Sequence, residues 1–309
     1  MTSTITAPDR LPRRRFLELG AAWFAATAAA GRAATAVKHA PLNDFVGVNT
    51  SSFSRQNRAS EPAKRIDPFD VPRVMREELD LRIIDLVSTM LNTRDHGPLE
   101  RFRAQAERAG CVIINLKVNI PDLRYDSDDA AARRHAIQEY KLWIDAAAVL
   151  GARWVRPFPA ATQPRWEILV AGYSELADHA ATHGITVLVE NYRWLETQPD
   201  AIPRLVAALK GRIRGQPDTF NWVDHPTRLL GLAKAFPLAA SCDWKVRDLG
   251  PNGEHPAYEL RPCFELGRKA GFRGPWCIEH INDDKAALLR ELRSITGQLR
   301  AWTADAGRG

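Results

Sequence analysis

Short apolar runs alternate with amphipathic stretches along the chain from residue 45 onward. The apolar runs are rich in β-branched residues, and the longer stretches between them carry apolar residues at spacings of three and four. Strands are expected at residues 45–49, 82–89, 111–119, 154–158, 186–191, 213–218, 238–246 and 276–280. Helices are expected near residues 70–79, 97–109, 128–150, 164–183, 199–210, 225–236, 257–270 and 284–303. This alternation predicts a parallel sheet.

Eight parallel strands with intervening helices favour a single-domain α/β fold, the (β/α)8 TIM barrel. Gly110, Gly184 and Gly271 stand where helix-to-strand turns need a left-handed residue. The competing architecture is an open doubly wound sheet. A dinucleotide-binding sheet of that kind needs Gly-x-Gly-x-x-Gly after its first strand, and this chain has no such motif there. The barrel is therefore the simpler interpretation.

The first 36 residues have the features of a targeting segment. Arg13, Arg14 and Arg15 precede Phe16 and Leu17, which gives the run of a twin-arginine signal, and an Ala-rich apolar stretch follows. That stretch is too short for a permanent membrane span, which needs about 20 apolar residues. We therefore expect a signal segment at residues 1–36 and the barrel at residues 37–309. The twin-arginine translocase would be the export partner, and the mature protein would be periplasmic or secreted. An ordinary basic N-terminal tail is the alternative.

Charge and cysteine content exclude little. The net charge is +6, but the expected signal segment holds five arginines against two acidic residues, so the mature chain would carry a charge near +3. That modest value gives no reason to expect a nucleic-acid partner.

The four cysteines lack Cys-x-x-Cys spacing. Buried free thiols are favoured over a disulfide, although a disulfide remains an alternative. They are Cys111, Cys242, Cys263 and Cys277.

Acidic side chains follow four successive strands of the predicted barrel. Glu190 comes after the fifth apolar run, Asp218 and Asp243 belong to the sixth and seventh, and Glu279 follows the eighth. In such barrels the catalytic groups project from the C-terminal ends of the strands. Four carboxylates that converge there would repel one another, so a hard cation such as Mn2+ or Mg2+ is the natural neutraliser. The alternative for each acid alone is a pair with a nearby arginine or a helix cap.

These residues resemble the xylose isomerase-like barrel superfamily, within its sugar phosphate isomerase/epimerase group. Members carry a metal-binding Glu after strand five, an Asp after strand six, a His-x-Lys motif on strand seven and a Glu after strand eight. Glu190, Asp218, Lys245 and Glu279 match this pattern, but Asp243 stands in place of the histidine. The resemblance implies a metal held by Glu190, Asp218, Asp243 and Glu279. An all-oxygen set still suits Mg2+ or Mn2+, although the departure also fits a member whose metal binding is weakened or lost.

In the ketose epimerase branch, the two glutamates also carry the proton to and from the carbon next to the carbonyl. The resemblance therefore implies that Glu190 and Glu279 are the catalytic acid/base pair. Asn221 takes the place of a substrate-binding histidine in that branch. Further candidates for substrate contact lie near strand ends, where tryptophan packing or charge neutralisation is the alternative role. They are Lys117, Arg156, Trp194, Trp222, Trp244, Lys245 and Arg247, with His225 and His280 as weaker candidates.

The leading hypothesis is a metal-dependent isomerase or epimerase that acts on a carbohydrate by proton transfer next to a carbonyl, through an enediolate. One alternative is an exported carbohydrate lyase or hydrolase on the same scaffold, and another is a sugar-binding barrel without activity. A barrel endonuclease for abasic DNA is a further relative, but it would need a histidine-rich zinc site and more positive charge than this chain offers.

Overall fold

Eight parallel strands form the centre of the computed structural model, which describes residue 42 and residues 45–306. The predicted signal segment at residues 1–36 lies outside these described residues. Hydrogen bonds join the strands in the order β6-β5-β4-β3-β2-β1-β8-β7. The strands are β1 (Val46–Asn49), β2 (Ile83–Val87), β3 (Val112–Val118), β4 (Trp154–Pro157), β5 (Thr186–Val189), β6 (Ile213–Gly215), β7 (Cys242–Lys245) and β8 (Trp276–Glu279).

The sheet curls into a barrel because its two end strands, β6 and β7, also come together. Parallel bridges pair Gly215 of β6 with Ala239, and Asp218 with Asp243 of β7. Every strand thus neighbours the one before it in sequence, which an open doubly wound sheet does not do. The structure confirms the predicted single-domain (β/α)8 TIM barrel.

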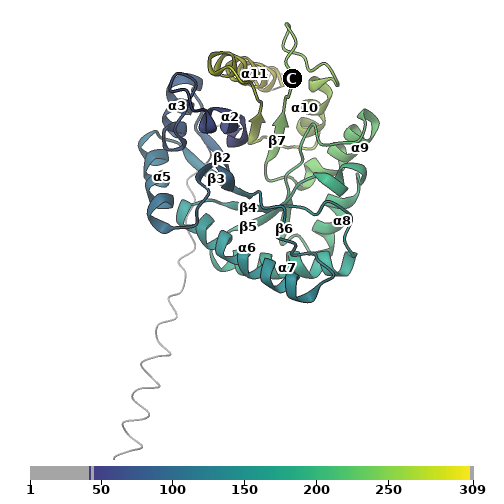
Figure 1. Cartoon of the computed structure of the whole chain (residues 1–309). Helices are drawn as coiled ribbons and strands as arrows, with labels where there is room; N and C mark the ends of the chain where they lie inside the picture. Colours follow the sequence, from purple (N-terminus) through teal and green to yellow (C-terminus); the bar gives the residue numbers. More distant parts are fainter. Residues whose placement is uncertain (1–41, 43–44, 307–309) are drawn as a thin grey trace, which may run out of the picture. The chain divides into compact units, whose positions relative to one another are not determined.

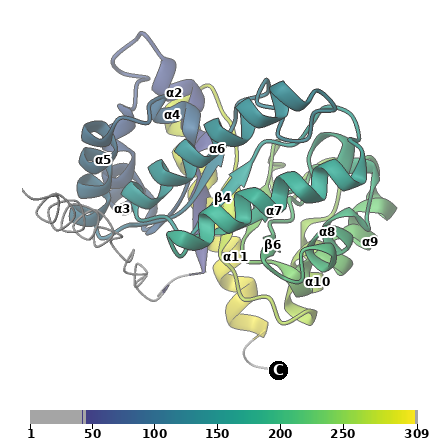
Figure 2. The same cartoon turned by 90° about the horizontal axis from the view of Figure 1, so that it is seen from below.

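Helices surround the strands, as Figure 1 shows, and the view from below in Figure 2 shows α6 and α7 side by side on the outer layer. The α-helices are α2 (Ser54–Arg58), α3 (Val71–Leu79), α4 (Ser88–Leu91), α5 (His96–Arg108), α6 (Ala130–Leu150), α7 (Trp166–Thr182), α8 (Ala201–Ala208), α9 (His225–Ala235), α10 (Leu260–Lys269) and α11 (Lys285–Ala306). The 3-10 helices are η1 (Thr50–Phe53), η2 (Pro68–Asp70), η3 (Arg193–Thr197) and η4 (Phe236–Leu238). Among the described helices, none is both long enough and apolar enough to cross a membrane.

The predicted helices and strands are all present, with shorter strands than expected. The three glycines expected to be left-handed, Gly110, Gly184 and Gly271, have φ values of 67°, 70° and 82°. The hydrophobic pattern missed the short helices η1, α2, η2, α4 and η3. All of them lie in the segments that follow strands β1, β2 and β5, and one turn of helix is too short to produce a recognisable period.

Side-chain alternation on β7 decides which residues face the barrel interior. Successive side chains of a strand point to opposite faces. Asp243 and Lys245 point inward, where they contact residues of other strands, while Trp244 points outward and packs edge-on against Trp276 at 5.3 Å between ring centroids. Trp244 is fully buried, and burying such a ring from water contributes about 1.5–3 kcal/mol to folding. The outer face of β7 therefore anchors the helical layer, and the inner face is left for chemistry.

The four cysteines are buried, and all are free thiols. This confirms the expectation of buried thiols, and the disulfide that had stayed open does not form.

Candidate active site

The four predicted acids meet at the C-terminal end of the barrel. Glu190 directly follows β5, Asp218 lies just after β6, Asp243 is on β7 and Glu279 ends β8. Asp218 and Asp243 are fully buried, and Glu190 is 5% exposed. One carboxylate oxygen from each of Glu190, Asp218 and Asp243 lies within 4.8 Å of the other two. The residues predicted to share one site from far apart in the sequence are therefore neighbours.

Basic side chains lie between these carboxylates. Lys117, from β3, contacts Asp243 and is 3.6 Å from Glu190. Arg156, from β4, places Nε 2.8 Å from Glu190 Oε2. Lys245 Nζ is 2.9 Å from Glu279 Oε1 and 3.4 Å from Asp218 Oδ2. Sequence reasoning gave Lys117 and Arg156 two possible roles, and their contacts are those of charge neutralisation.

Two asparagines complete the network. Asn49, at the end of β1, donates to Glu279 Oε2 at 2.8 Å and to Asp243 Oδ1 at 3.3 Å. Asn221 donates to Asp218 Oδ2 at 2.9 Å and to Glu190 Oε1 at 3.3 Å. The other oxygen of Asp218 accepts the backbone N–H groups of residues 220 and 221 at 2.7 and 3.0 Å. These bonds fix the carboxylates in place, which a preorganised site requires.

Burial and neighbouring charge act differently on the pKa values of Glu190, Asp218 and Asp243. Burial raises the pKa of Asp218 to about 6. Burial and the nearby acids raise the pKa of Asp243 well above its ordinary range, although Lys117 opposes this. Burial also acts to raise the pKa of Glu190, but Lys117 and Arg156 outweigh it, so the pKa lies below its ordinary value. Of these three carboxylates, Glu190 is thus the one that the site holds most firmly in its ionised form.

The donor set fits a hard divalent cation. Glu190, Asp218 and Asp243 offer only oxygen ligands, and their spacing suits one shared ion. Burial is the main cause of the raised pKa values of Asp218 and Asp243, and the neighbouring acids add to it, so a cation would favour the ionised form of both groups. A cation here would compete with Lys117 for Asp243. Glu279, predicted as a fourth ligand, is not part of this three-residue cluster and contacts Lys245 and Asn49 instead.

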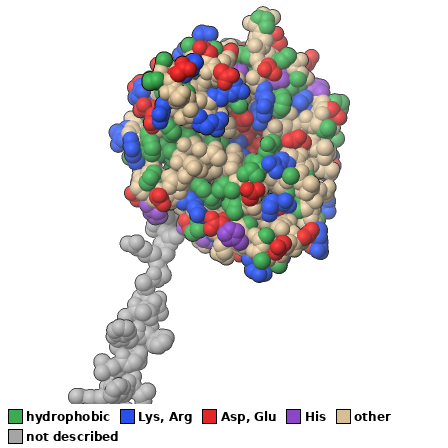
Figure 3. Space-filling model, viewed as in Figure 1, with side chains coloured by type: hydrophobic (Ala, Val, Ile, Leu, Met, Phe, Trp, Pro, Cys, Tyr) green, Lys and Arg blue, Asp and Glu red, His purple; other side chains and the backbone are tan. Residues whose placement is uncertain are grey.

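A small polar cavity of about 140 Å³ opens above these acids. Drug-sized ligands occupy pockets of about 300–1,000 Å³, so this volume favours a small substrate. The interspersed red and blue side chains near the middle of the face in Figure 3 reflect the mixed charge of this part of the molecule. The predicted residues that line the cavity are Lys117, Arg156, Glu190, Asn221, Lys245, Arg247 and Glu279. Asp218 and Asp243 lie beneath it.

Sequence reasoning missed five lining residues, which are Asn49, Ser51, Asn119, Phe158 and Tyr192. All five stand within three residues of the end of a strand, so the rule that located the acids also points to them.

The predicted aromatic contacts lie elsewhere. Trp222 is buried, donates its Nε1 hydrogen to the backbone oxygen of Asp218 at 2.9 Å, and lies against Gly231 of α9. Trp244 faces the helical layer, and Trp194 packs against the core. Of the two roles weighed for these rings, packing is the one that their contacts support, because none lines the cavity.

The two weaker histidine candidates also have structural contacts. His280 is buried and its Nε2 lies 2.6 Å from Glu291 Oε2, while His225 Nδ1 lies 3.2 Å from Arg228 Nη1. Neither histidine lines the cavity.

Comparison with known proteins agrees with this architecture. A family model described as xylose isomerase-like TIM barrel matches residues 77–304, which is more than half of the chain. The chain belongs to the xylose isomerase-like TIM barrel family. No curated protein sequence matches it.

Several solved structures share the fold of this family member. D-psicose 3-epimerase from Clostridium cellulolyticum H10, solved with D-tagatose, has a TM-score of 0.67 and 14% identity, covering 84% of this chain and 99% of that chain. An L-ribulose 3-epimerase has a TM-score of 0.68 and 14% identity, covering 85% of this chain and 97% of that chain. A xylose isomerase-like TIM barrel protein from Mycobacterium smegmatis, solved with magnesium, has a TM-score of 0.60 and 21% identity, covering 85% of this chain and 97% of that chain. Identities this low establish the fold alone.

Proposed function

We propose that this protein is a sugar isomerase or epimerase that moves a proton next to a carbonyl group through an enediolate. The observation that carries the proposal is that Glu190 and Glu279 line one small polar cavity, while Asp218 and Asp243 lie below them. Two carboxylates that reach the same small substrate are what proton removal and return require. The similarity to D-psicose and L-ribulose 3-epimerases supports the same chemistry.

Glu190 takes the role of the base. Its carboxylate is held ionised by Lys117 and Arg156, so it is ready to accept a proton from carbon near neutral pH. Glu279 is the partner that returns or removes the proton on the other side, and Asn49 and Lys245 fix its position. The ammonium groups of Lys117 and Lys245 lie where negative charge develops on the substrate oxygens, which lowers the barrier to enediolate formation.

A divalent cation, Mg2+ or Mn2+, is the proposed cofactor, with Glu190, Asp218 and Asp243 as the residues that hold it. When bound, it would supply further positive charge next to the substrate oxygens. Asn221 and Lys245 contact these carboxylates and also line the cavity, so they orient both the acids and the substrate. The guanidinium carbon of Arg247 lies 5.2 Å from the centre of the Phe220 ring. Because Arg247 also lines the same cavity, it can contact substrate hydroxyls.

The proposed substrate is a free sugar. Export by the twin-arginine route, which residues 1–36 predict, would take the protein away from the cytoplasm, where sugar phosphates are abundant. The small cavity volume also favours a monosaccharide over a longer glycan.

The test is hydrogen exchange. Purified protein is incubated with Mg2+ or Mn2+ and a panel of free pentuloses and ketohexoses in D2O, and deuterium next to the carbonyl is measured by NMR. We expect incorporation with at least one sugar. Glu190→Gln and Glu279→Gln should each lower its rate by about 10²- to 10⁴-fold, since each removes one acid/base group. Arg212→Gln, on the protein surface, serves as the matched control and should leave the rate unchanged.

Absence of exchange with every sugar would contradict the proposal. If the parent protein binds a sugar without exchange, and both glutamine variants bind it equally well, the protein is a binding barrel. Release of reducing ends from a glycoside without added metal would instead identify a hydrolase, in which the two glutamates act on a glycosidic bond.

A further inference from the structure

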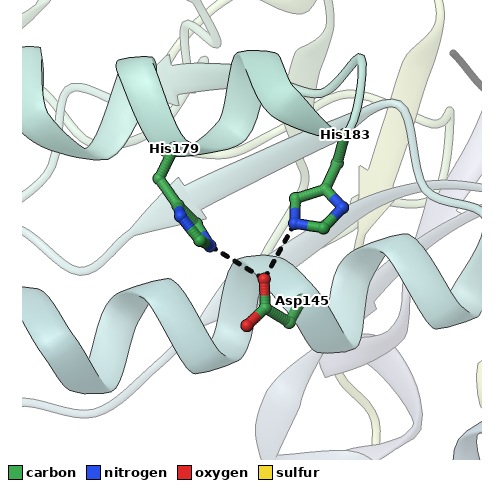
Figure 4. Close-up of side chains that lie close together, drawn as sticks. All are labelled: Asp145, His179 and His183. Carbon is green, nitrogen blue, oxygen red and sulfur yellow. Dashed lines mark hydrogen bonds and ion pairs between the residues drawn. The ribbon is translucent and has the colours of Figure 1, made fainter. Parts of the chain in front are cut away.

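A second cluster of metal-ligating side chains lies on the outer helices. Asp145 projects from α6, and His179 projects from α7, which His183 directly follows. Figure 4 shows both imidazole rings pointing at the same carboxylate. The Nε2 atoms of His179 and His183 are 2.8 and 2.9 Å from Asp145 Oδ1.

The spacing of the two histidines explains why they converge. Residues four apart on a helix lie on the same face, one turn above the other. The rings of His179 and His183 are 5.4 Å apart between centroids. The facing helix α6 then brings one oxygen atom to both rings, so three possible ligand atoms from two helices lie within 4.8 Å of one another.

We propose that Asp145, His179 and His183 form a site for a transition-metal ion, with Zn2+ as the expected occupant and water as its fourth ligand. Imidazole nitrogens suit Zn2+, Ni2+ and Cu2+ far better than Mg2+. Two nitrogens, one carboxylate oxygen and one water give the tetrahedral set that Zn2+ takes when one position stays open to solvent.

The distances from both histidines to the carboxylate oxygen are close to those found around a bound ion. Ligands about 2.0–2.1 Å from a tetrahedral ion are about 3.3 Å from one another. The nitrogens here are 2.8 and 2.9 Å from the carboxylate oxygen, so each must withdraw by about half an ångström. The side chains are 27%, 29% and 42% exposed for His179, His183 and Asp145, which leaves room for this shift and for the water.

The place of the cluster points to a role in stability. The C-terminal ends of α6 and α7 lie at the face of the barrel opposite the candidate active site, and in TIM barrels that face serves stability. An ion held there would join α6 to α7 on the outer layer. It would also differ in ligand type from the oxygen-only set of Glu190, Asp218 and Asp243, so the two sites prefer different metals.

Zinc titration of the metal-stripped protein tests the proposal. Calorimetry is performed with 5 mM Mg2+ present, which occupies an oxygen site but competes poorly for imidazole. We expect one Zn2+ per chain with micromolar affinity, and a rise in Tm of about 5 °C at saturating Zn2+. His179→Gln and His183→Gln should each weaken binding by at least about 10-fold. His96→Gln, an exposed histidine at the start of α5, should bind like the parent.

Co2+ gives a second readout, because tetrahedral coordination produces a strong visible absorption that octahedral coordination lacks. The parent and His96→Gln should show it, and His179→Gln should not. Stoichiometric Zn2+ binding that survives in both His179→Gln and His183→Gln would overturn the proposal, as would zinc binding weaker than about 1 mM in the parent. These variants leave the central cavity intact, so deuterium exchange into sugars is an independent result.

Discussion

Replacing Lys117 with methionine tests the charge balance of the candidate active site. The Lys117 side chain is 2% exposed and contacts Asp243, which is fully buried. Glu190, its second partner, keeps Arg156 at 2.8 Å after the substitution. Among the described side chains, the Asn49 amide at 3.3 Å is then the hydrogen-bond donor left to the Asp243 carboxylate, and Arg156 interacts with it only through its charge. The cost of Lys117→Met therefore falls mainly on Asp243.

The loss of stability caused by Lys117→Met can be estimated from the unequal remaining contacts of Asp243 and Glu190. Removing one partner of a buried ion pair costs about 3–5 kcal/mol, because an uncompensated charge stays behind. Asp243 can avoid part of that cost by taking up a proton. Its pKa in the folded protein is already raised by burial, and loss of Lys117 raises it further. We therefore expect a loss of about 3 kcal/mol near pH 8 without metal, and a smaller loss at pH 5.

The sign of this pH dependence is fixed by linkage. A carboxyl group whose folded-state pKa lies above its unfolded value binds a proton more tightly when folded. It therefore supports folding at low pH, and that support disappears as the pH rises through the folded-state pKa. The deficit of Lys117→Met relative to the parent should accordingly grow between pH 5 and pH 8.

Urea unfolding in the presence of EDTA measures the effect. Combining Lys117→Met with Asp243→Asn should restore most of the lost stability, since no buried charge then remains unpaired. Lys141→Met removes a more exposed pair with Glu175 and should cost less than about 1 kcal/mol. Mg2+ should stabilise Lys117→Met more than the parent, because the ion no longer competes with an ammonium group.

Two results would refute this reasoning. The first is a loss for Lys117→Met no larger than that of Lys141→Met. The second is equal stabilisation of the parent and Lys117→Met by Mg2+, which would mean that Lys117 and the ion do not share Asp243.

Three further predictions follow from burial and packing. Asp218 has a folded-state pKa of about 6 against an ordinary value of about 4. Its protonated form therefore stabilises the metal-free protein at low pH by about 2–3 kcal/mol, and this stabilisation is lost as the pH rises from about 4 to about 6. Asp218→Asn should remove that pH dependence from the free energy of unfolding, as urea unfolding at several pH values will show. Gly172→Ala should cost about 1–3 kcal/mol, because its Cβ would lie 2.6 Å from the backbone oxygen of Tyr125, whereas Gly297→Ala in open space should gain up to about 1 kcal/mol, as thermal unfolding will show. The four thiols should resist a thiol reagent in the native protein and all react in denaturant, since burial raises the pKa of Cys111 to about 11 and the others are buried too; fewer than four reactive thiols after unfolding would contradict this.

The fold was predictable because its signal is repeated along the chain. Each apolar run predicted one strand, and the order of strands and helices left one architecture that suits them all. The acids could be placed for the same reason, since the C-terminal ends of parallel strands gather at one end of a barrel. Glu190, Asp218 and Asp243 were predicted together from that rule and lie together in the structure.

The pairing of Lys117 with Asp243 could not be predicted from the sequence. Lys117 is on β3 and Asp243 on β7, and whether a lysine reaches across depends on the width and tilt of the closed barrel. The outward orientation of Trp244, in contrast, could have been predicted from the sequence. A strand that points Asp243 inward must point the next residue outward, so a role for Trp244 in the cavity was inconsistent with the role given to its neighbour.

The same pair explains how the barrel accommodates an aspartate where the resemblance implies a histidine. A neutral imidazole adds no charge to a cluster of acids, whereas Asp243 adds one negative charge in a fully buried position. Such a charge is tolerated only when a partner lies against it. Lys117 supplies that partner from the opposite part of the sheet. Burial acts to lower the pKa of Lys117, but the negative charges of Asp243, Glu190 and Asp85 together outweigh it, so the pKa is raised. Asp243 and Lys117 therefore act as one unit, so we expect a change at either position to alter the stability of the site and, if the proposed cation binds there, its affinity as well.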